Sequence, residues 1–452
     1  MNTTTDARAT PSPLVPSRRG SGLLARVRVR WWIFAFMCAF AFMSYILRQP
    51  VTVAAVPMMP ELHFSQFQIG MLYWAFVAGY TCFQLLGGVY GQRMGARRCF
   101  VVISLIAFVC VMALPLAPSV TSGMTLFVAL MITQSVLGVS QGPVFPVSAG
   151  VFETWFPPPR WSLVLGVQAM FMDLGGAAAP LVLTRLMDVL GWKEAVVLTS
   201  LPALLLVPLW AWYGRNTPRE HPKVTAEELA EIGGSAPIGI TNIDWRRLGH
   251  LLLNRELLLI TVSYACMNYV FYLILAWCFL YLIQVRNFTM LDGGLLAALP
   301  PIGAAIGAAL GGKVGTMLVV RYGPRWGFRL IPLIMLPLAG LLLIAGVRAG
   351  NPYWAVAALT AAYGAVETLE GPSWAAMMYV AREDTMAATG ALNTGGNLGG
   401  VIGIPIVAYL TDNGMWTSAF VLGAVFATVS GLLWFWIDAT RRFEPPPAAA
   451  HA

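Results

Sequence analysis

Two stretches of the chain decide the fold: "GVQAMFMDLGGAAAPLVLTRLMDVLGW" at residues 166–192 and "GALNTGGNLGGVIGIPIVAYLTDNGMW" at residues 390–416. The second stretch repeats positions of the first at a constant offset of 224 residues, ending with Trp192 and Trp416. A single pair of glycine motifs could recur only because small residues let membrane helices approach closely. The number of matches at one offset instead predicts an internal repeat.

Two further pairs of motifs follow the same order along the chain. "GGVYGQRMGAR" (87–97) matches "GGKVGTMLVVRYGPR" (311–325), and "QGPVF" (141–145) matches "EGPSW" (370–374). An ordered set of matches at nearly constant spacing indicates that the chain contains two copies of one unit. Parallel repeats of six helices are a transporter architecture, with the substrate site at the interface between the repeats.

The composition places both copies in a membrane. Of the 452 residues, 58% are hydrophobic and 11% are charged, and the mean hydropathy is +0.71. A transmembrane helix needs about 20 apolar residues, and strand-like alternation is absent. We therefore expect an all-α membrane protein with twelve transmembrane helices in two pseudo-symmetric six-helix bundles, with spans near residues 31–59, 68–91, 99–117, 123–152, 161–186, 194–213, 257–285, 292–318, 327–347, 353–381, 385–411 and 415–438.

Charge sets the expected orientation. Most of the 28 Lys and Arg residues fall on the side of the two termini, for example Arg26, Arg28 and Arg30. Short basic loops stay in the cytoplasm, so we expect both termini there and the protein in the cell (inner) membrane, in contact with lipid. The net charge of +8 is explained by these flanks, and no nucleic-acid partner is expected.

The longest polar interval divides the chain into regions. It carries "RNTPREHPKVTAEELAEI" and contains a short expected helix with Thr225 as its N-cap. The first 30 residues lack the apolar core of a signal peptide. The expected regions are a disordered cytoplasmic tail (1–30), a first six-helix bundle (31–213), a cytoplasmic linker (214–250), a second six-helix bundle (251–440) and a cytoplasmic tail (441–452).

Enzyme chemistry finds no support in the sequence. No HExxH, GxSxG or Walker motif occurs. The cysteines have no metal-ligand spacing, and the histidines fall in loops, edges or tails: His63, His221, His250 and His451. We expect no enzyme activity, no cofactor and no metal. A sensor built on a transporter fold, which binds a ligand without moving it, remains an alternative.

The motifs together resemble a known family. "GGVYGQRMGARR" resembles the loop between the second and third helices of the major facilitator superfamily. "GYTCFQ", "QGPVFP", "TWFPPPRWSLVLG", "RNTPREHPKV" and "GPSWA…GALNTGGNLGGVIGIP" resemble its anion:cation symporter family. The resemblance implies transport of organic anions, such as sugar acids, aromatic carboxylates or dicarboxylates, by alternating access, commonly with protons.

Arg48 is the first candidate binding residue. It lies 17 residues after Trp31, or about 25 Å of helix, which is too far for its side chain to return to the cytoplasmic face. A charge near the centre of a membrane helix costs about 3 kcal/mol and needs a partner. That partner is either an anionic substrate, which we favour, or a fixed carboxylate from Glu367 or Glu370. By resemblance, Arg48 and Tyr45 match the pair that contacts the substrate carboxylate.

The acids that the resemblance assigns to proton coupling are missing. This chain has Leu47 and Gln141 at those positions. The repeat, however, aligns Gln141 with Glu370, so a carboxylate stands at the pseudo-symmetric position of the second half. Glu370 is the leading candidate for proton coupling, followed by Glu367, three residues earlier on the same helix face, and by Asp173.

Further polar and aromatic residues are candidates for the cavity, although each is individually more typical of contacts between helices. Pairs at i, i+4 spacing rank highest. The full predicted substrate-binding set is Tyr45, Arg48, Tyr80, Gln84, Gln141, Gln168, Tyr264, Asn268, Tyr272, Trp374, Asn393 and Asn397.

The loop motif also departs from the family pattern. Gln92 replaces an acid that helps to latch the outward-open state in the family, and the counterpart near Thr316 also lacks one. We expect a weakened charge latch. The expected residues of this conformational gate are Gly88, Arg93, Gly95, Arg97 and Arg98.

The sequence therefore predicts a secondary active transporter for a small organic anion, working as a monomer. Proton symport is the favoured mode of coupling. Anion exchange and uniport stay open.

Overall fold

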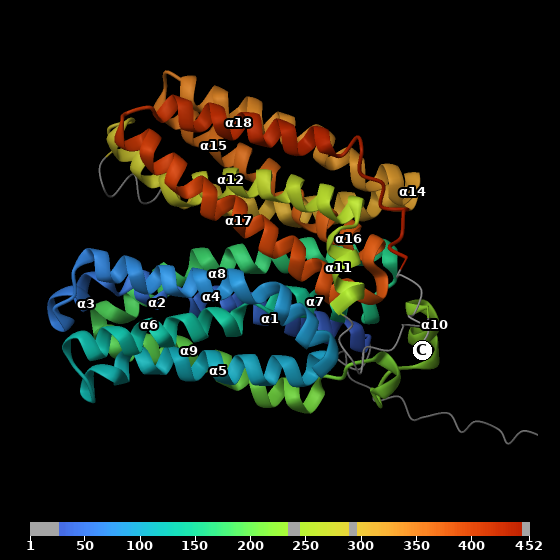
Figure 1. Cartoon of the computed structure of the whole chain (residues 1–452), viewed down its shortest axis with the longest axis horizontal. Coiled ribbons are helices and arrows are strands. Elements are labelled where there is room, and N and C mark those ends of the chain that lie inside the picture. The colour runs from blue at the N-terminus through green and yellow to red at the C-terminus, as the bar shows by residue number, and fades with distance from the viewer. Residues whose placement is uncertain (1–26, 234–244, 289–295, 445–452) are drawn as a thin grey trace, which may run out of the picture.

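The computed structural model describes residues 27–233, 245–288 and 296–444. The described residues form helices joined by short turns and contain no strand. The helices form two groups that lie side by side (Figure 1). Most of the predicted tails, residues 1–26 and 445–452, lies outside the described residues.

The first half is built from the helices before the linker. They are α1 (Val29–Leu47), α2 (Pro50–Val53), α3 (Ala55–Leu62), α4 (Gln66–Met94), α5 (Ala96–Leu116), α6 (Gly123–Gln141), α7 (Val144–Trp155), α8 (Trp161–Leu190) and α9 (Trp192–Tyr213). The first predicted span, 31–59, is not one helix, because α1 ends at Leu47 with Arg48 as its C-cap. Pro50 follows; it has no N–H to donate to the carbonyl of Ile46, and its ring crowds that carbonyl.

The second half repeats this arrangement. Its helices are α12 (Arg255–Gln284), α14 (Leu299–Arg348), α15 (Pro352–Glu367), α16 (Glu370–Ala381), α17 (Thr385–Asp412) and α18 (Trp416–Leu433). In the described residues ten helical segments are long and apolar enough to cross a membrane, and two of them, Leu299–Arg348 and Pro352–Asp412, each cover two predicted spans. The first of these turns at Gly323, whose φ of 74° favours glycine. The chain is an all-helical membrane protein of two six-helix halves.

The linker helix α10 (Ala226–Ile232) joins the first half through the start of α1. The Thr225 hydroxyl accepts a hydrogen bond from Glu228 N at 3.2 Å, which confirms the predicted N-cap. The Glu228 carboxylate in turn accepts from the backbone of Val29 and Arg30 at 3.2 and 3.0 Å. Arg30 and Arg28 bond to Glu231 and hold the pKa of that carboxyl below its usual value. The linker thus caps the N-terminus of the first membrane helix.

The two halves touch at one end and diverge at the other (Figure 1). Their ribbons approach near α7 and α16 and separate toward α3. At the approaching end, a side chain at Gly88 would collide with the carbonyl of Met386, and one at Gly371 with that of Ser162. Glycine is required at these crossings because the backbones of opposite halves are in direct contact. The described ends of the chain lie at this same closed end, since Phe443 N donates to Val380 O at 2.9 Å.

Candidate functional site

A cavity lies between the two halves and has an empty volume of about 640 Å³, part of it open to solvent. Side chains from both halves line it. They are Tyr45, Arg48, Tyr80, Phe145, Leu165, Gln168, Ala169, Met172, Tyr264, Asn268, Phe271, Tyr272, Glu370, Trp374, Asn393 and Asn397. Every predicted substrate-binding residue except Gln84 and Gln141 is in this lining. The repeat interface therefore holds the polar residues that the sequence singled out.

Arg48 is the C-cap of α1 and lines the cavity. Its Nη2 donates to Ser44 Oγ at 3.0 Å, and Ser44 Oγ donates to Gln141 Oε1. The guanidinium lies over the rings of Tyr45 and Tyr80, 4.0 and 4.9 Å from their centroids. Ring faces attract cations without neutralising them. Gln141 thus acts on the cavity indirectly, through Ser44.

A fixed ion pair does not hold Arg48. Across residues 27–233, 245–288 and 296–444, no carboxylate forms an ion pair with it, so neither Glu367 nor Glu370 is its fixed partner. Its buried Nε has no hydrogen-bond partner there. A guanidinium held in place by hydrogen bonds and ring faces, without a carboxylate, is suited to bind a carboxylate or sulfonate from a ligand.

Glu370 faces the same cavity from the second half. It is the first residue of α16 and is only 8% exposed. Tyr264 OH donates to Glu370 Oε1 at 2.7 Å, and Trp374 Nε1 donates to the Tyr264 oxygen at 3.2 Å. These neutral donors orient the carboxyl group without forming an ion pair.

Glu367 and Asp173 lie behind the cavity wall. Glu367 is fully buried, and neither of its oxygens has a hydrogen-bond partner among the described residues; the same holds for Asp173 Oδ2. Glu367 interacts electrostatically with Asp173 and with Glu370. The three predicted coupling residues therefore form one group that spans both halves, in which only Glu370 reaches the cavity.

Amide and phenol groups join the halves beside Arg48. Tyr272 OH donates to Asn397 Oδ1 at 2.6 Å, and Asn397 Nδ2 donates to Asn393 O at 2.8 Å. Longer contacts of 3.4 Å run from Asn393 Nδ2 to Tyr80 OH and from Asn397 Nδ2 to Gln84 Oε1. Gln84 is therefore a supporting residue, buried behind the amides.

The remaining predicted amides line the cavity wall. Asn268 Nδ2 donates to Tyr264 O at 2.9 Å, and Gln168 Nε2 donates to Met37 O at 3.4 Å. Both predicted i, i+4 pairs, Asn268 with Tyr272 and Asn393 with Asn397, face the cavity.

Phe145 is a lining residue that the sequence did not single out. Its ring lies 6.4 Å from Tyr45 in the first half and 6.4 Å from Trp374 in the second. An aromatic arc thus connects the neighbour of Arg48 with the neighbour of Glu370. The motif "QGPVF" contained the signal, because Phe145 aligns with Trp374 in the repeat at the same offset as the Gly-Pro pair.

The predicted gate loop lies at the closed end, but its arginines do not all reach the other half. Gly95 joins α4 to α5 with a φ of 81°. Arg97 Nε donates to Ala211 O at 3.0 Å, within the same half, and the side chains of Arg93 and Arg98 are exposed. The cross-half contact comes from Gln92, whose Nε2 donates to the carbonyl of Glu383.

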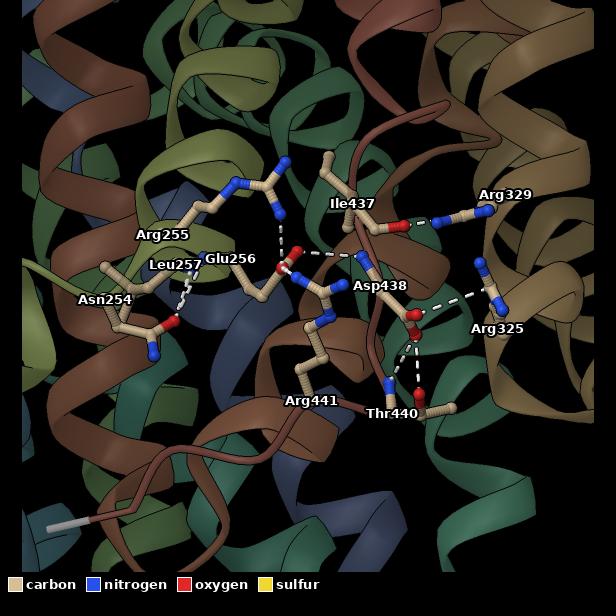
Figure 2. Close-up of polar contacts among 10 residues, drawn as sticks. All are labelled: Asn254, Arg255, Glu256, Leu257, Arg325, Arg329, Ile437, Asp438, Thr440 and Arg441. Atoms are coloured by element: carbon tan, nitrogen blue, oxygen red, sulfur yellow. Dashed lines mark hydrogen bonds and ion pairs between the residues drawn. The ribbon is translucent and has the colours of Figure 1, made fainter.

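The second half has an ionic cluster at the equivalent place (Figure 2). Arg329 Nε donates to Ile437 O at 2.6 Å, and Arg325 Nε lies 3.3 Å from Asp438 Oδ2. Glu256 Oε2 accepts from Asp438 N at 2.8 Å. In both halves an arginine after the second helix of the repeat thus bonds to a carbonyl near the end of the sixth helix. Sequence reasoning did not identify the cluster, because its members are far apart along the chain.

Comparisons with known proteins agree with this architecture. The family model of the Major Facilitator Superfamily matches residues 32–378 and 306–451. The "Probable sulfoacetate transporter SauU" of Cupriavidus necator (strain ATCC 17699 / DSM 428 / KCTC 22496 / NCIMB 10442 / H16 / Stanier 337) is 28% identical over 434 residues, 94% of this chain and 97% of its own. The "Probable galactarate/D-glucarate transporter GudP" of Bacillus subtilis (strain 168) is 26% identical over 433 residues, 90% of this chain and 92% of its own.

Solved structures share the fold. The transporter FucP in its outward conformation superposes with a TM-score of 0.68 at 14% identity, covering 91% of this chain and 100% of that one. The proton:xylose symporter XylE, bound to 6-bromo-6-deoxy-D-glucose, gives a TM-score of 0.71 at 12% identity, covering 91% and 98%. The chain belongs to the Major Facilitator Superfamily, a family of membrane transporters and not of enzymes.

Proposed function

We propose that this chain is a secondary active transporter that moves a small organic anion across the cell membrane by alternating access, coupled to protons. The observation that carries the proposal is Arg48, a cavity-lining guanidinium without an ion-pair partner in the described residues. The names of the relatives, which include transporters for sulfoacetate, galactarate or D-glucarate, and hexuronate, support an anion as the substrate.

The way the halves meet supports alternating access. The cavity is closed where Gly88 and Gly371 contact the opposite half. We propose a monomer with both termini in the cytoplasm, so that this closed end is the cytoplasmic one and the cavity faces outward. Rocking of the two halves about the fixed site would then expose Arg48 to the cytoplasm.

Glu370 is the proposed proton carrier, because it shares the cavity with Arg48. It is bound by neutral donors, and within the described residues it forms no ion pair with an arginine or lysine that would oppose its protonation. Burial without a hydrogen bond disfavours a charged carboxylate far more than a neutral one, so Glu367 and Asp173 are proposed as auxiliary members of the group.

Uptake into proteoliposomes tests the proposal. Purified protein is reconstituted and supplied with a panel of radiolabelled sugar acids, aromatic carboxylates and sulfonates, with and without an inwardly directed proton gradient. We expect accumulation of at least one anion above its equilibrium level only with the gradient. Equal uptake with and without the gradient would contradict proton coupling and favour uniport or exchange.

Two variants assign the roles. Glu370→Gln should abolish accumulation driven by the gradient while anion binding persists, and retention of full accumulation would remove Glu370 from coupling. Binding of an anion without uptake by the wild-type protein, under any gradient, would favour a sensor.

A further inference from the structure

The cavity has one charged group on each side. Among its lining residues in the described chain, Arg48 is the sole cation and Glu370 the sole acid. The aromatic arc of Tyr45, Phe145 and Trp374 connects them. A ligand whose anionic end binds Arg48 therefore directs its distal end toward Glu370 along an apolar floor.

Glu370 restricts what that distal end can be. An ionised carboxylate accepts hydrogen bonds and repels a second anion at short range. A hydroxyl group can donate to the ionised carboxylate and can also accept from the protonated one. A second carboxylate on the ligand fits only when Glu370 carries a proton.

We propose that Glu370 is the specificity-determining residue for the distal end of the ligand, and that the substrate class is small monoanions ending in a hydroxyl group rather than dianions. The inference rests on the proposed function, because it assumes that an organic anion binds at Arg48. Dianions bind this site only with one additional proton.

Other titratable and charged groups surround Glu370 and need to be separated from it. In the described part of the chain they are Tyr264 from α12, Asp173 from α8, Glu367 from α15 and, across the cavity, Tyr45 from α1 and Arg48 just after it. Of these acids, only Glu370 reaches the cavity. Only its removal should therefore abolish the pH-dependent preference for monoanions over dianions.

Two matched pairs of probes test the inference by calorimetric titration of the detergent-purified protein. Gluconate and glucarate differ only in a terminal hydroxymethyl or carboxylate group, as do isethionate and sulfoacetate. All four are fully ionised from about pH 6 to pH 8, so changes in affinity report on the protein. Each monoanion serves as the control for its dianion, because the contact with Arg48 is common to both.

We expect the monoanion to bind more tightly at pH 8 in at least one pair. The ratio of dianion to monoanion affinity should rise by up to about tenfold for each pH unit lowered, because the dianion complex takes up one more proton. In Glu370→Gln the ratio should lose its pH dependence, and in Glu370→Asp, which keeps the charge, it should retain it.

Three results would overturn the inference. A ratio independent of pH in the wild-type protein, or a pH dependence that survives in Glu370→Gln, would exclude Glu370 as the selecting group while leaving anion transport intact. Absence of binding by all four probes, together with no uptake of any anion in the panel, would overturn the proposed function and the inference with it. If the variants do not fold, the wild-type titration still tests the inference, because a ratio independent of pH overturns it.

Discussion

Both halves interrupt a helix beside a Gly-Pro pair, at Gly142-Pro143 itself in the first half and at Thr368 and Leu369, just before Gly371-Pro372, in the second. The halves differ in the residue that precedes the Gly-Pro pair. In the first half that residue is Gln141, which accepts a hydrogen bond from Ser44 and so steadies Arg48 without neutralising it. In the second half it is Glu370, which is held by Tyr264 and forms no ion pair in the part of the chain that the structure describes. The repeat thus keeps the cation and the acid on opposite halves, where a ligand or a proton can reach each of them.

Removing the cation should have the largest effect. Arg48→Ala should raise the Kd of any transported anion by about 30-fold or more, because truncating one member of a buried charge pair costs about 2–5 kcal/mol. Titration calorimetry on the purified protein measures this change. Arg48→Lys, which keeps the charge but loses the planar geometry, should raise the Kd by a smaller factor. Unchanged affinity in both variants would exclude Arg48 from the site.

Making the halves alike should have the next largest effect. Gln141→Glu places an acid where Ser44 connects it to Arg48, and the guanidinium would pair with that carboxylate instead of the ligand. We expect the Kd for the anion to rise about tenfold, or about 1.4 kcal/mol, and to recover as the pH falls. The matched control is Gln141→Met, which removes the hydrogen bond to Ser44 without adding a charge.

The closed end offers a smaller, symmetric comparison. Gln92 donates to Glu383 O across the halves, and Thr316 Oγ1 accepts from Leu163 N at 3.1 Å, also across the halves. Both contacts use neutral side chains at equivalent positions of the repeat. These hydrogen bonds connect the halves where the sequence lacks the acids of the family's charge latch. Gln92→Leu and Thr316→Val should each shift the balance toward the state open at this end by about 1 kcal/mol, or roughly fivefold.

Distances between spin labels measure that shift. Labels at the exposed positions 98 and 321 report on opposite halves near the closed end. Both single variants should increase the population at long distance, and the double variant should increase it further. A change in only one of them would show that the two contacts are not equivalent.

The sequence predicted the parts of the molecule that depend on local pattern. Hydropathy and the internal repeat predicted the two halves. Polar residues inside apolar spans, such as Asn393 and Arg48, predicted lining residues of the cavity, because polar side chains within a membrane face the protein interior or a cavity and not the lipid. The sequence predicted a single span near residues 31–59, so the end of the helix at Leu47 was missed. Phe145 was missed because an apolar residue in an apolar span carries no signal by itself.

Contacts between distant segments were outside what the sequence could predict. The cluster of Arg325, Asp438 and Glu256 depends on the segment after α18, which brings Asp438 to Glu256 at the start of α12 (Figure 2). The first half bonds Arg97 to a carbonyl at the matching place and has no acid in that contact. The ionic part of the cluster is therefore a difference between the halves that only the three-dimensional arrangement reveals.

The ionic cluster around Asp438 in the second half gives the smallest expected effect. Burial alone would raise the pKa of Asp438, but hydrogen bonds from Thr440 and the charges of Arg325 and Arg329 outweigh it and lower the pKa. A lowered pKa means that the carboxylate stabilises the folded state above the usual aspartate range, near pH 4, and that this contribution disappears as the pH falls through the lower folded value. Asp438→Asn should cost about 0.5 kcal/mol at pH 7, since Arg325 is largely exposed. Thermal melts from pH 7 down to about pH 3 should show the difference between variant and wild type shrinking, and a difference that grows on acidification would contradict this account.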